Sequence, residues 1–111
     1  MRGTNLGELE ELILLAVGIL HPHAYGVAVM DALDQQAGRS LNISAVHAVL
    51  TRLEEKGLLK STMGEPSDVR GGRRKRIFLL TASGKRALED AHELRTQLYK
   101  RIPKIVFQFS Y

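Results

Sequence analysis

Apolar residues recur at intervals of three and four along residues 6–20, which predicts an amphipathic helix. They form two rows on the helix rather than one. The first row runs through Leu6, Leu9, Ile13, Ala16 and Leu20, and the second through Leu12, Leu15 and Ile19. A chain of this size has one core to cover, so the second row is expected to pack against a partner. Pro22 ends the helix, because a proline disfavours helical geometry in the residue before it.

Polar residues mark the expected start of this helix. Thr4 or Asn5 is predicted to cap it, since short polar side chains accept hydrogen bonds from the free backbone amides of the first turn. Glu8, Glu10 and Glu11 follow in the early turns, where the helix dipole favours negative charge.

Two more helices are predicted before residue 57. One covers residues 24–37 and is stopped by Gly38, with Gly26 marking a close approach between helices. The other covers residues 44–56 and is stopped by Gly57. Val46, Leu50 and Leu53 are its expected buried residues. Its opposite face is small, polar or basic, as a helix that enters a DNA groove requires. That face comprises Ser44, Ala45, His47, Ala48, Thr51 and Arg52.

The sequence pattern of the second half of the chain predicts a hairpin and one long helix. Residues 58–63 and 77–80 are expected strands, separated by a segment rich in turn formers and cations. Thr81 is expected to cap a helix that runs to about residue 102, and Pro103 breaks it. Its apolar positions are Ala87, Ala91, Leu94, Leu98 and Ile102. This order predicts a mainly α fold with a small β-hairpin (α+β), a winged helix-turn-helix with a carboxy-terminal helix. We expect a DNA-binding domain over residues 1–81 and a dimerisation helix with an apolar tail over 82–111.

Composition argues against most enzyme classes. The chain has 111 residues and no cysteine, which excludes a zinc ribbon, an iron–sulfur site and a thiol nucleophile. It contains neither a phosphate-binding glycine loop nor a Gly-x-Ser-x-Gly elbow, and His21 and His23 lack metal-ligand spacing. We therefore predict a protein that is not an enzyme and uses no metal or cofactor.

Hydropathy and the start of the chain bear on location. The longest apolar run, residues 12–20, is about half of what a membrane span needs, and no secretory leader is recognisable. We expect a cytoplasmic protein that does not enter a membrane.

Positive charge is concentrated in the middle of the sequence. Residues 39–86 hold eleven Lys or Arg against four acids, whereas residues 1–38 hold one cation against five acids. The net charge is +4. A basic segment between acidic and nearly neutral ends is typical of a surface that binds a polyanion.

Several motifs, in order, resemble the PadR-like family of transcriptional regulators. Leu6-Gly7-Glu8-Leu9-Glu10 is similar to the family's opening helix, and Ala24-Tyr25-Gly26 to its second. The stretch from Ser44 to Leu58 resembles its recognition helix, and Gly64 to Arg76 its wing. Leu80-Thr81-Ala82-Ser83-Gly84 resembles the entry to the last helix. His47 stands where the family usually has Tyr, and this chain resembles the short subgroup with one carboxy-terminal helix.

The resemblance implies a homodimeric repressor whose first and last helices build the dimer interface. The implied interface residues are Leu9, Leu12, Leu15, Ile19, Leu94, Leu98 and Ile102. It also implies a small hydrophobic or aromatic effector, whose identity the sequence does not define.

The basic surface and the resemblance together predict a sequence-specific regulator of double-stranded DNA with a roughly palindromic operator. The predicted contacts are Tyr25, Ser44, Ala45, His47, Thr51, Arg52, Arg73, Arg74 and Lys75. The main alternative is a winged-helix adaptor that binds proteins and not DNA. RNA binding is a third hypothesis, disfavoured because the basic region lacks stacking aromatics.

The last nine residues carry an alternating pattern. Ile105, Phe107, Phe109 and Tyr111 alternate with Val106, Gln108 and Ser110, which predicts an extended segment with one apolar side. We expect residues 103–111 to fold back over the dimer interface. There they would pack on Leu12, Leu15 and Ile19 of the same first helix or of its symmetry mate.

Overall fold

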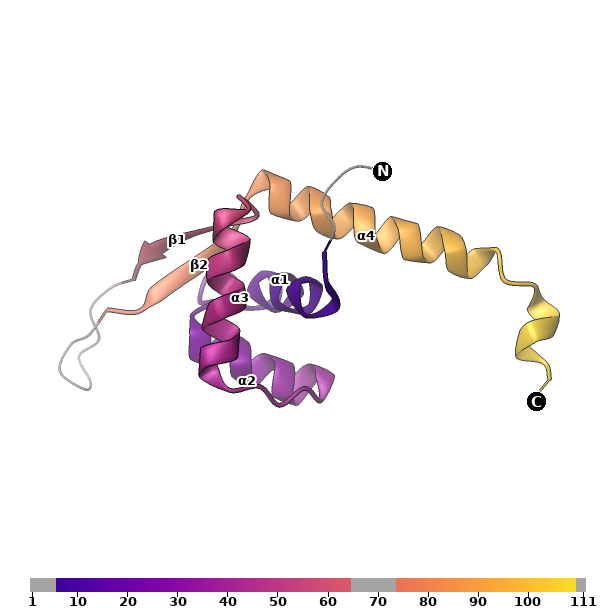
Figure 1. Ribbon diagram of the computed structural model, residues 1–111, viewed down its shortest axis with the longest axis horizontal. Helices are drawn as coiled ribbons and strands as arrows, with labels where there is room; N and C mark the ends of the chain where they lie inside the picture. The colour runs from indigo at the N-terminus through magenta and orange to yellow at the C-terminus, as the bar shows by residue number, and fades with distance from the viewer. Residues whose placement is uncertain (1–5, 65–73, 110–111) are drawn as a thin grey trace.

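The computed structural model describes residues 6–64 and 74–109, which form three helices, a hairpin and a long final helix (Figure 1). The helices are α1 (Glu8–Leu20), α2 (Gly26–Ala37), α3 (Ile43–Glu55) and α4 (Ala82–Lys100). The strands are β1 (Leu59–Met63) and β2 (Arg76–Leu80), and a 3₁₀-helix covers Lys104–Phe107. This is the α+β winged-helix fold that the sequence predicts. Among the described residues, no helix is long and apolar enough to cross a membrane.

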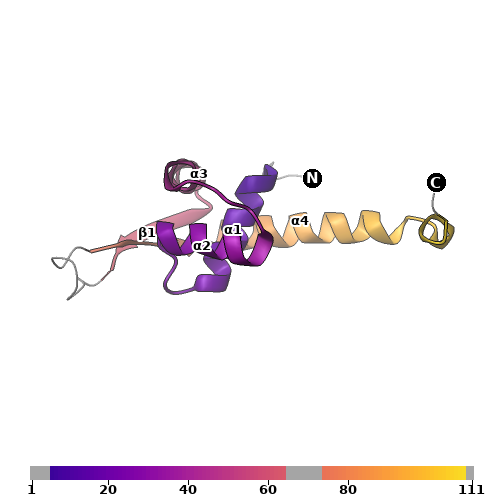
Figure 2. The same cartoon turned by 90° about the horizontal axis from the view of Figure 1, so that it is seen from below.

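The core lies between α1, α2, α3 and the hairpin. Its largest fully buried side chains include Ile13 and Leu14 from α1 and Leu50 and Leu53 from α3. The predicted buried residues of the third helix are confirmed, and Val49 joins them. Helix α4 extends away from this core, so the molecule measures 60 × 30 × 20 Å (Figure 2).

The hairpin is tied to the helices through its backbone and through Phe78. Strands β1 and β2 are antiparallel, with Leu59 opposite Leu80 and Met63 opposite Arg76. The Phe78 amide donates to the carbonyl of Ala24 at 2.8 Å, and the Phe78 side chain is buried. The hairpin is therefore held at the start of α2.

Three helix starts differ from the sequence prediction. Helix α2 begins at Gly26 rather than at residue 24, with Tyr25 as its N-cap. Side-chain hydrogen bonds account for the other two. Helix α1 is capped at Gly7, not at Thr4 or Asn5, because Glu10 in its first turn accepts from the Gly7 amide at 3.0 Å. Thr4 and Asn5 lie outside the described residues. Helix α3 begins one residue earlier than expected, because Asn42 accepts from the Ala45 amide at 2.7 Å. In both cases a side chain three residues from its partner determines the start.

Three local predictions are confirmed. Gly38 ends α2 with a φ of 65°, a left-handed conformation that glycine adopts without strain. Gly26 marks a close approach, since a Cβ there would lie 2.6 Å from the His47 ring. Thr81 caps α4 by accepting from the Gly84 amide at 3.0 Å.

The carboxy-terminal segment differs from the prediction. Residues 104–107 form a 3₁₀-helix rather than an extended strand, and Pro103 is its N-cap. The segment lies at the far end of α4, away from α1 of the same chain (Figures 1 and 2). Packing on the chain's own first helix is therefore wrong, and the reason is length. A helix of 19 residues spans about 28 Å and carries the tail out of reach.

Candidate nucleic-acid interface

Helix α3 presents one polar face to solvent. Its buried side is apolar, so the remaining positions point outward. Asn42 is the N-cap of α3 and therefore sets where the first exposed position of the helix lies. Ser44, His47 and Thr51 are exposed, whereas Ala45 is half-buried. In Figure 1 the helix crosses the front of the molecule with this side uncovered. Four of the residues predicted for the interface are thus on one element.

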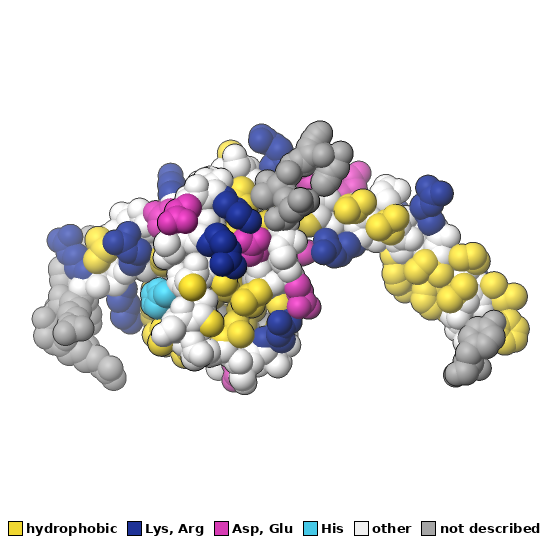
Figure 3. Space-filling view, in the orientation of Figure 1, with side chains coloured by type: hydrophobic (Ala, Val, Ile, Leu, Met, Phe, Trp, Pro, Cys, Tyr) yellow, Lys and Arg dark blue, Asp and Glu magenta, His cyan; other side chains and the backbone are white. Residues whose placement is uncertain are grey.

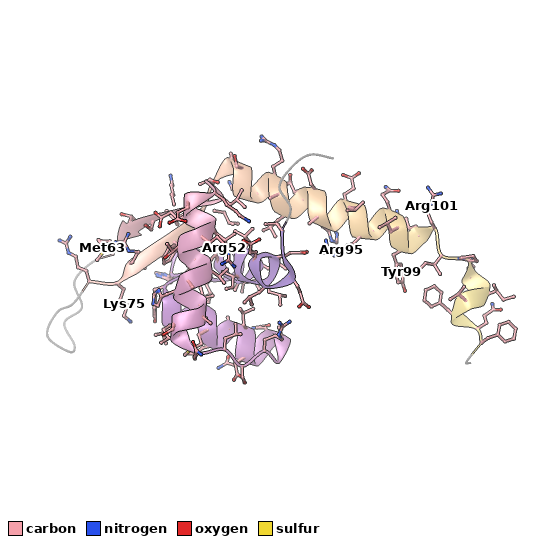
Figure 4. All side chains as sticks on the ribbon, viewed as in Figure 1. Arg52, Met63, Lys75, Arg95, Tyr99 and Arg101 are labelled. Carbon is pink, nitrogen blue, oxygen red and sulfur yellow. The ribbon has the colours of Figure 1, made fainter. Side chains whose placement is uncertain are left out.

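Arg52, also on α3, is held by an ion pair with α1. Its Nε donates to Glu10 Oε2 at 3.0 Å, and Figure 4 shows the side chain directed toward α1. Lys56 Nζ donates to the same oxygen at 2.8 Å and to Oε1 at 3.1 Å. About half of the Arg52 side chain remains exposed. Its guanidinium therefore lies at the rim of the exposed face.

Glu10 stays ionised in this cluster. Burial by itself would raise the pKa of the Glu10 carboxyl, but hydrogen bonds from Lys56, the Gly7 amide and Arg52 outweigh it. The net effect lowers the pKa of Glu10 to about 2. A permanent negative charge thus anchors the carboxy-terminal half of α3 to the first turn of α1.

The sequence analysis missed Glu10 and Lys56 as parts of this surface. A signal was present, because Arg52 and Lys56 are four residues apart and share a helix face. Their partner lies more than 40 residues away along the chain. No local pattern could identify it.

The hairpin brings its cations close to the helices. Arg74 and Lys75 are exposed, and Arg73 lies outside the described residues. Lys75 Nζ lies 4.0 Å from the centre of the Tyr25 ring, a distance typical of a cation–π interaction. Figure 4 shows Lys75 directed back toward the helices. Two predicted interface residues from distant parts of the sequence therefore touch.

A chain of polar contacts fixes the hairpin against α3. Arg76 Nη1 donates to Ser61 Oγ at 2.8 Å, and Ser61 Oγ donates to Glu54 Oε2 at 2.7 Å. These residues belong to β2, β1 and α3. The exposed face of α3 and the hairpin are thus held as one surface, over which Lys and Arg side chains are visible in Figure 3.

The residues predicted for a dimer interface divide between the core and the surface. Leu9 and Leu12 are half-buried and pack against the core. The other five are exposed, namely Leu15, Ile19, Leu94, Leu98 and Ile102. Arg95 on α4 pairs with Glu11 on α1 at 3.2 Å, which links the two helices that carry them.

A family model describes this combination of elements. The model of the PadR-like transcriptional regulators matches residues 14–90, from the middle of α1 to the first half of α4. The chain belongs to this family. The matched segment of this PadR-like regulator contains α2, α3 and the hairpin, so it includes every predicted DNA contact. Residues 103–109, at the carboxy-terminal end, lie outside it.

Two solved structures share the fold of this PadR-like regulator. A PadR family regulator from Eggerthella lenta is 26% identical, with a TM-score of 0.65 over 89% of this chain and 86% of its own. Bacillus subtilis PadR in complex with operator DNA is 22% identical, with a TM-score of 0.63 over 78% of this chain and 47% of its own.

One sequence relative is much longer than this chain. An uncharacterized transposon protein of Streptomyces fradiae is 35% identical over 92 residues. The match covers 82% of this chain and 24% of that protein, so this chain spans about a quarter of its length.

Proposed function

We propose that this PadR-like regulator is a homodimeric repressor that binds a roughly palindromic, double-stranded operator. The observation that carries the proposal is the continuous surface of α3 and the hairpin. The Arg76–Ser61–Glu54 hydrogen bonds join the exposed polar face of α3 to the hairpin and its exposed cations, and Lys75 of the hairpin lies over the Tyr25 ring at the start of α2. A helix in the major groove with a basic wing beside it is how winged helix-turn-helix proteins bind DNA. Bacillus subtilis PadR, which shares the fold, is bound to operator DNA in its structure.

The residues divide into two groups by their chemistry. Ser44, Ala45, His47, Thr51 and Arg52 lie on or beside the face of α3 and would reach base edges or the groove rim. Tyr25, Arg74 and Lys75 would contact phosphates, together with Arg73. The first group would then determine which DNA sequence is preferred. The second group would determine the position of the protein along the duplex and much of its affinity.

Binding should follow two-fold symmetry. A symmetric dimer presents two α3 helices, so the operator should contain two half-sites about one helical turn apart, or a multiple of that spacing.

Salt titration tests the DNA proposal. Binding of operator and unrelated duplexes is measured at two or more salt concentrations. Each phosphate contact releases counterions, so affinity should fall steeply with salt. Affinity that is flat with salt would contradict DNA binding and favour the protein adaptor.

A matched pair of variants tests the division of contacts. Arg74→Ala should weaken binding to all duplexes alike and reduce the salt slope by about 1. Arg101→Ala removes the same charge from the far end of α4 and should change neither the DNA affinity nor the salt slope (Figure 4). A changed site preference in Arg74→Ala would show that this residue contacts bases.

A further inference from the structure

Exposed apolar side chains gather on two parts of this chain. Of the twelve large hydrophobic side chains exposed in the described residues, eight lie on α4 beyond Glu93 and on the segment that follows. We call residues 103–109 the tail. Two more, Leu15 and Ile19, are neighbours on α1 and form what we call the α1 patch. Ile19 is 63% exposed, which is unusual for an isoleucine beside a core.

The tail has a defined shape and does not cover the α1 patch of its own chain. The Tyr99 and Phe107 rings lie 5.6 Å apart, so the 3₁₀-helix is fixed against the last turn of α4. The Val106 amide donates to the Pro103 carbonyl at 3.0 Å and stabilises the bend. Figure 3 shows a hollow between the tail and the helices near the core, with apolar atoms along the outer half of α4 and the tail.

We propose that the tail packs on the α1 patch of a second copy of this chain, and that the two copies exchange tails reciprocally. The inference rests on the proposed homodimer, and the tail itself lies outside the residues that the family model matches.

The two-fold symmetry of a dimer explains why the tail would reach this patch. Two α4 helices related by an axis perpendicular to them pair antiparallel. A pair centred between Leu94 and Leu98 brings Ile102 opposite Asp90 of the second copy. The tail then lies beside the first half of the second copy's α4.

The second copy's α1 lies beside that same part of α4. Glu11 pairs with Arg95, and a Cβ at Gly18 would lie 3.4 Å from Leu80, just before α4 begins. Leu15 and Ile19 fall within or next to this span of α1. Antiparallel pairing with this centre would thus place the tail beside the α1 patch of the second copy.

The apolar area is sufficient for a stable pair. Each exposed side chain in the two regions would bury on the order of 80 Å², about half of a large residue's surface. Ten of them give roughly 800 Å² per copy, which is what a standard interface buries on each partner. The four apolar residues of the tail contribute about four-tenths of this area, so α4 pairing without them would leave a small interface.

Cysteine cross-linking tests the placement, because the chain has no cysteine of its own. A tagged copy with Ile19→Cys is mixed with an untagged copy carrying Ile105→Cys, and a short thiol-to-thiol reagent is added. We expect a cross-linked pair that contains one copy of each. Val27→Cys on α2, also exposed, is the matched control and should not link to Ile105→Cys.

A substitution tests the contribution to affinity. Phe107→Ser should raise the dissociation constant of the dimer about tenfold or more, as loss of a buried aromatic anchor does. Val27→Ser, the control, should leave it unchanged. Sedimentation equilibrium measures both, and DNA binding is titrated on the same samples.

The outcomes separate this proposal from the proposed function. A dimer that binds DNA but neither cross-links at Ile19 nor weakens with Phe107→Ser overturns the tail exchange and leaves the proposed function standing. Linkage within one chain, shown by a double-cysteine variant at the monomer mass, also overturns the exchange. Cross-linked dimers that bind no DNA support the exchange and overturn the proposed function. A monomeric protein overturns both.

Discussion

Residues 8–80 and the arm formed by α4 and the tail differ in where their apolar side chains lie. All fourteen buried hydrophobic residues in the described part of the chain fall between Ile13 and Phe78. The only buried residue of α4 is Gly84, at its start. The first region therefore encloses its own core, whereas the arm exposes most of its apolar surface. In the proposed function, the first region would bind DNA and the arm would form the interface with a second chain.

The ion pairs show how these regions are joined. In the described residues every salt bridge involves a glutamate in the first turn of α1. Glu8 pairs with Arg39 before α3, Glu10 with Arg52 and Lys56 on α3, and Glu11 with Arg95 on α4. Helix α1 is thus linked by ion pairs both to α3 and to the arm.

The largest expected effect comes from the junction between the two regions. In Gly84→Ala the new Cβ would meet the backbone carbonyl of Leu58, which cannot turn away. We expect a loss of unfolding free energy beyond the ~3 kcal/mol of ordinary overpacking. Thermal and urea unfolding measure it.

A second helical glycine is the control for this substitution. At Gly18 the nearest heavy atom is a flexible Leu80 methyl at 3.4 Å. Gly18→Ala should be neutral or should stabilise by up to about 1 kcal/mol, because alanine favours helix. Equal losses at both sites would contradict a steric cause.

A pair of leucine substitutions tests the contrast between core and arm directly. Leu50 is fully buried and Leu98 is exposed. Leu50→Ala should cost ~3 kcal/mol of unfolding free energy at any protein concentration. Leu98→Ala should cost almost nothing in dilute protein and should weaken only the proposed dimer. Urea unfolding at several concentrations measures both, and a concentration-independent loss in Leu98→Ala would show that the arm has a core of its own.

The Glu10 cluster should make stability depend on acid. Its folded-state pKa of about 2 lies below its ordinary value of 4.5, so the ionised form stabilises the fold. That stabilisation is complete above pH 4.5 and is lost as the pH falls toward 2. Glu10→Gln should lower the unfolding free energy at pH 7 by ~2 kcal/mol, the order of a hydrogen bond to a charged group.

The same variant should also flatten the change in stability over this acidic range. Glu8→Gln removes an exposed pair and should cost well under 1 kcal/mol. If unfolding of the wild type does not change between pH 4.5 and 2, the cluster does not stabilise the fold in this way.

The smallest expected effect concerns the contact between α2 and the wing. Tyr25→Leu removes the ring under Lys75 and should lower the unfolding free energy by about 0.5–1 kcal/mol. The proposed DNA affinity should fall as well, since Lys75 would lose its fixed position. Lys75→Met, tested by the same titrations, should lower the unfolding free energy by a similar amount. The double variant should lose little more than either single variant, because both substitutions remove the same contact.

Sequence alone determined the four α-helices and the two strands, because helix and strand periodicities are local properties. The spacing of Leu50 and Leu53, the stop at Gly38 and the cap at Thr81 each act within a few residues. It also identified Leu15 and Ile19 as apolar positions beyond the needs of one core, because two rows on one helix imply two buried sides. The family resemblance came from these same local motifs.

Only the tertiary structure determined which residues come into contact when they are far apart in the sequence. Glu10 with Lys56, Lys75 with Tyr25 and Gly84 with Leu58 are joined by folding, and no periodicity specifies such pairs. The tail shows the same limit. Its alternation of apolar and polar residues predicted a strand, but the contact of Phe107 with Tyr99 favours a compact turn. A local sequence pattern indicates that a side chain is buried. The arrangement of elements that are distant in the sequence determines which residues it packs against.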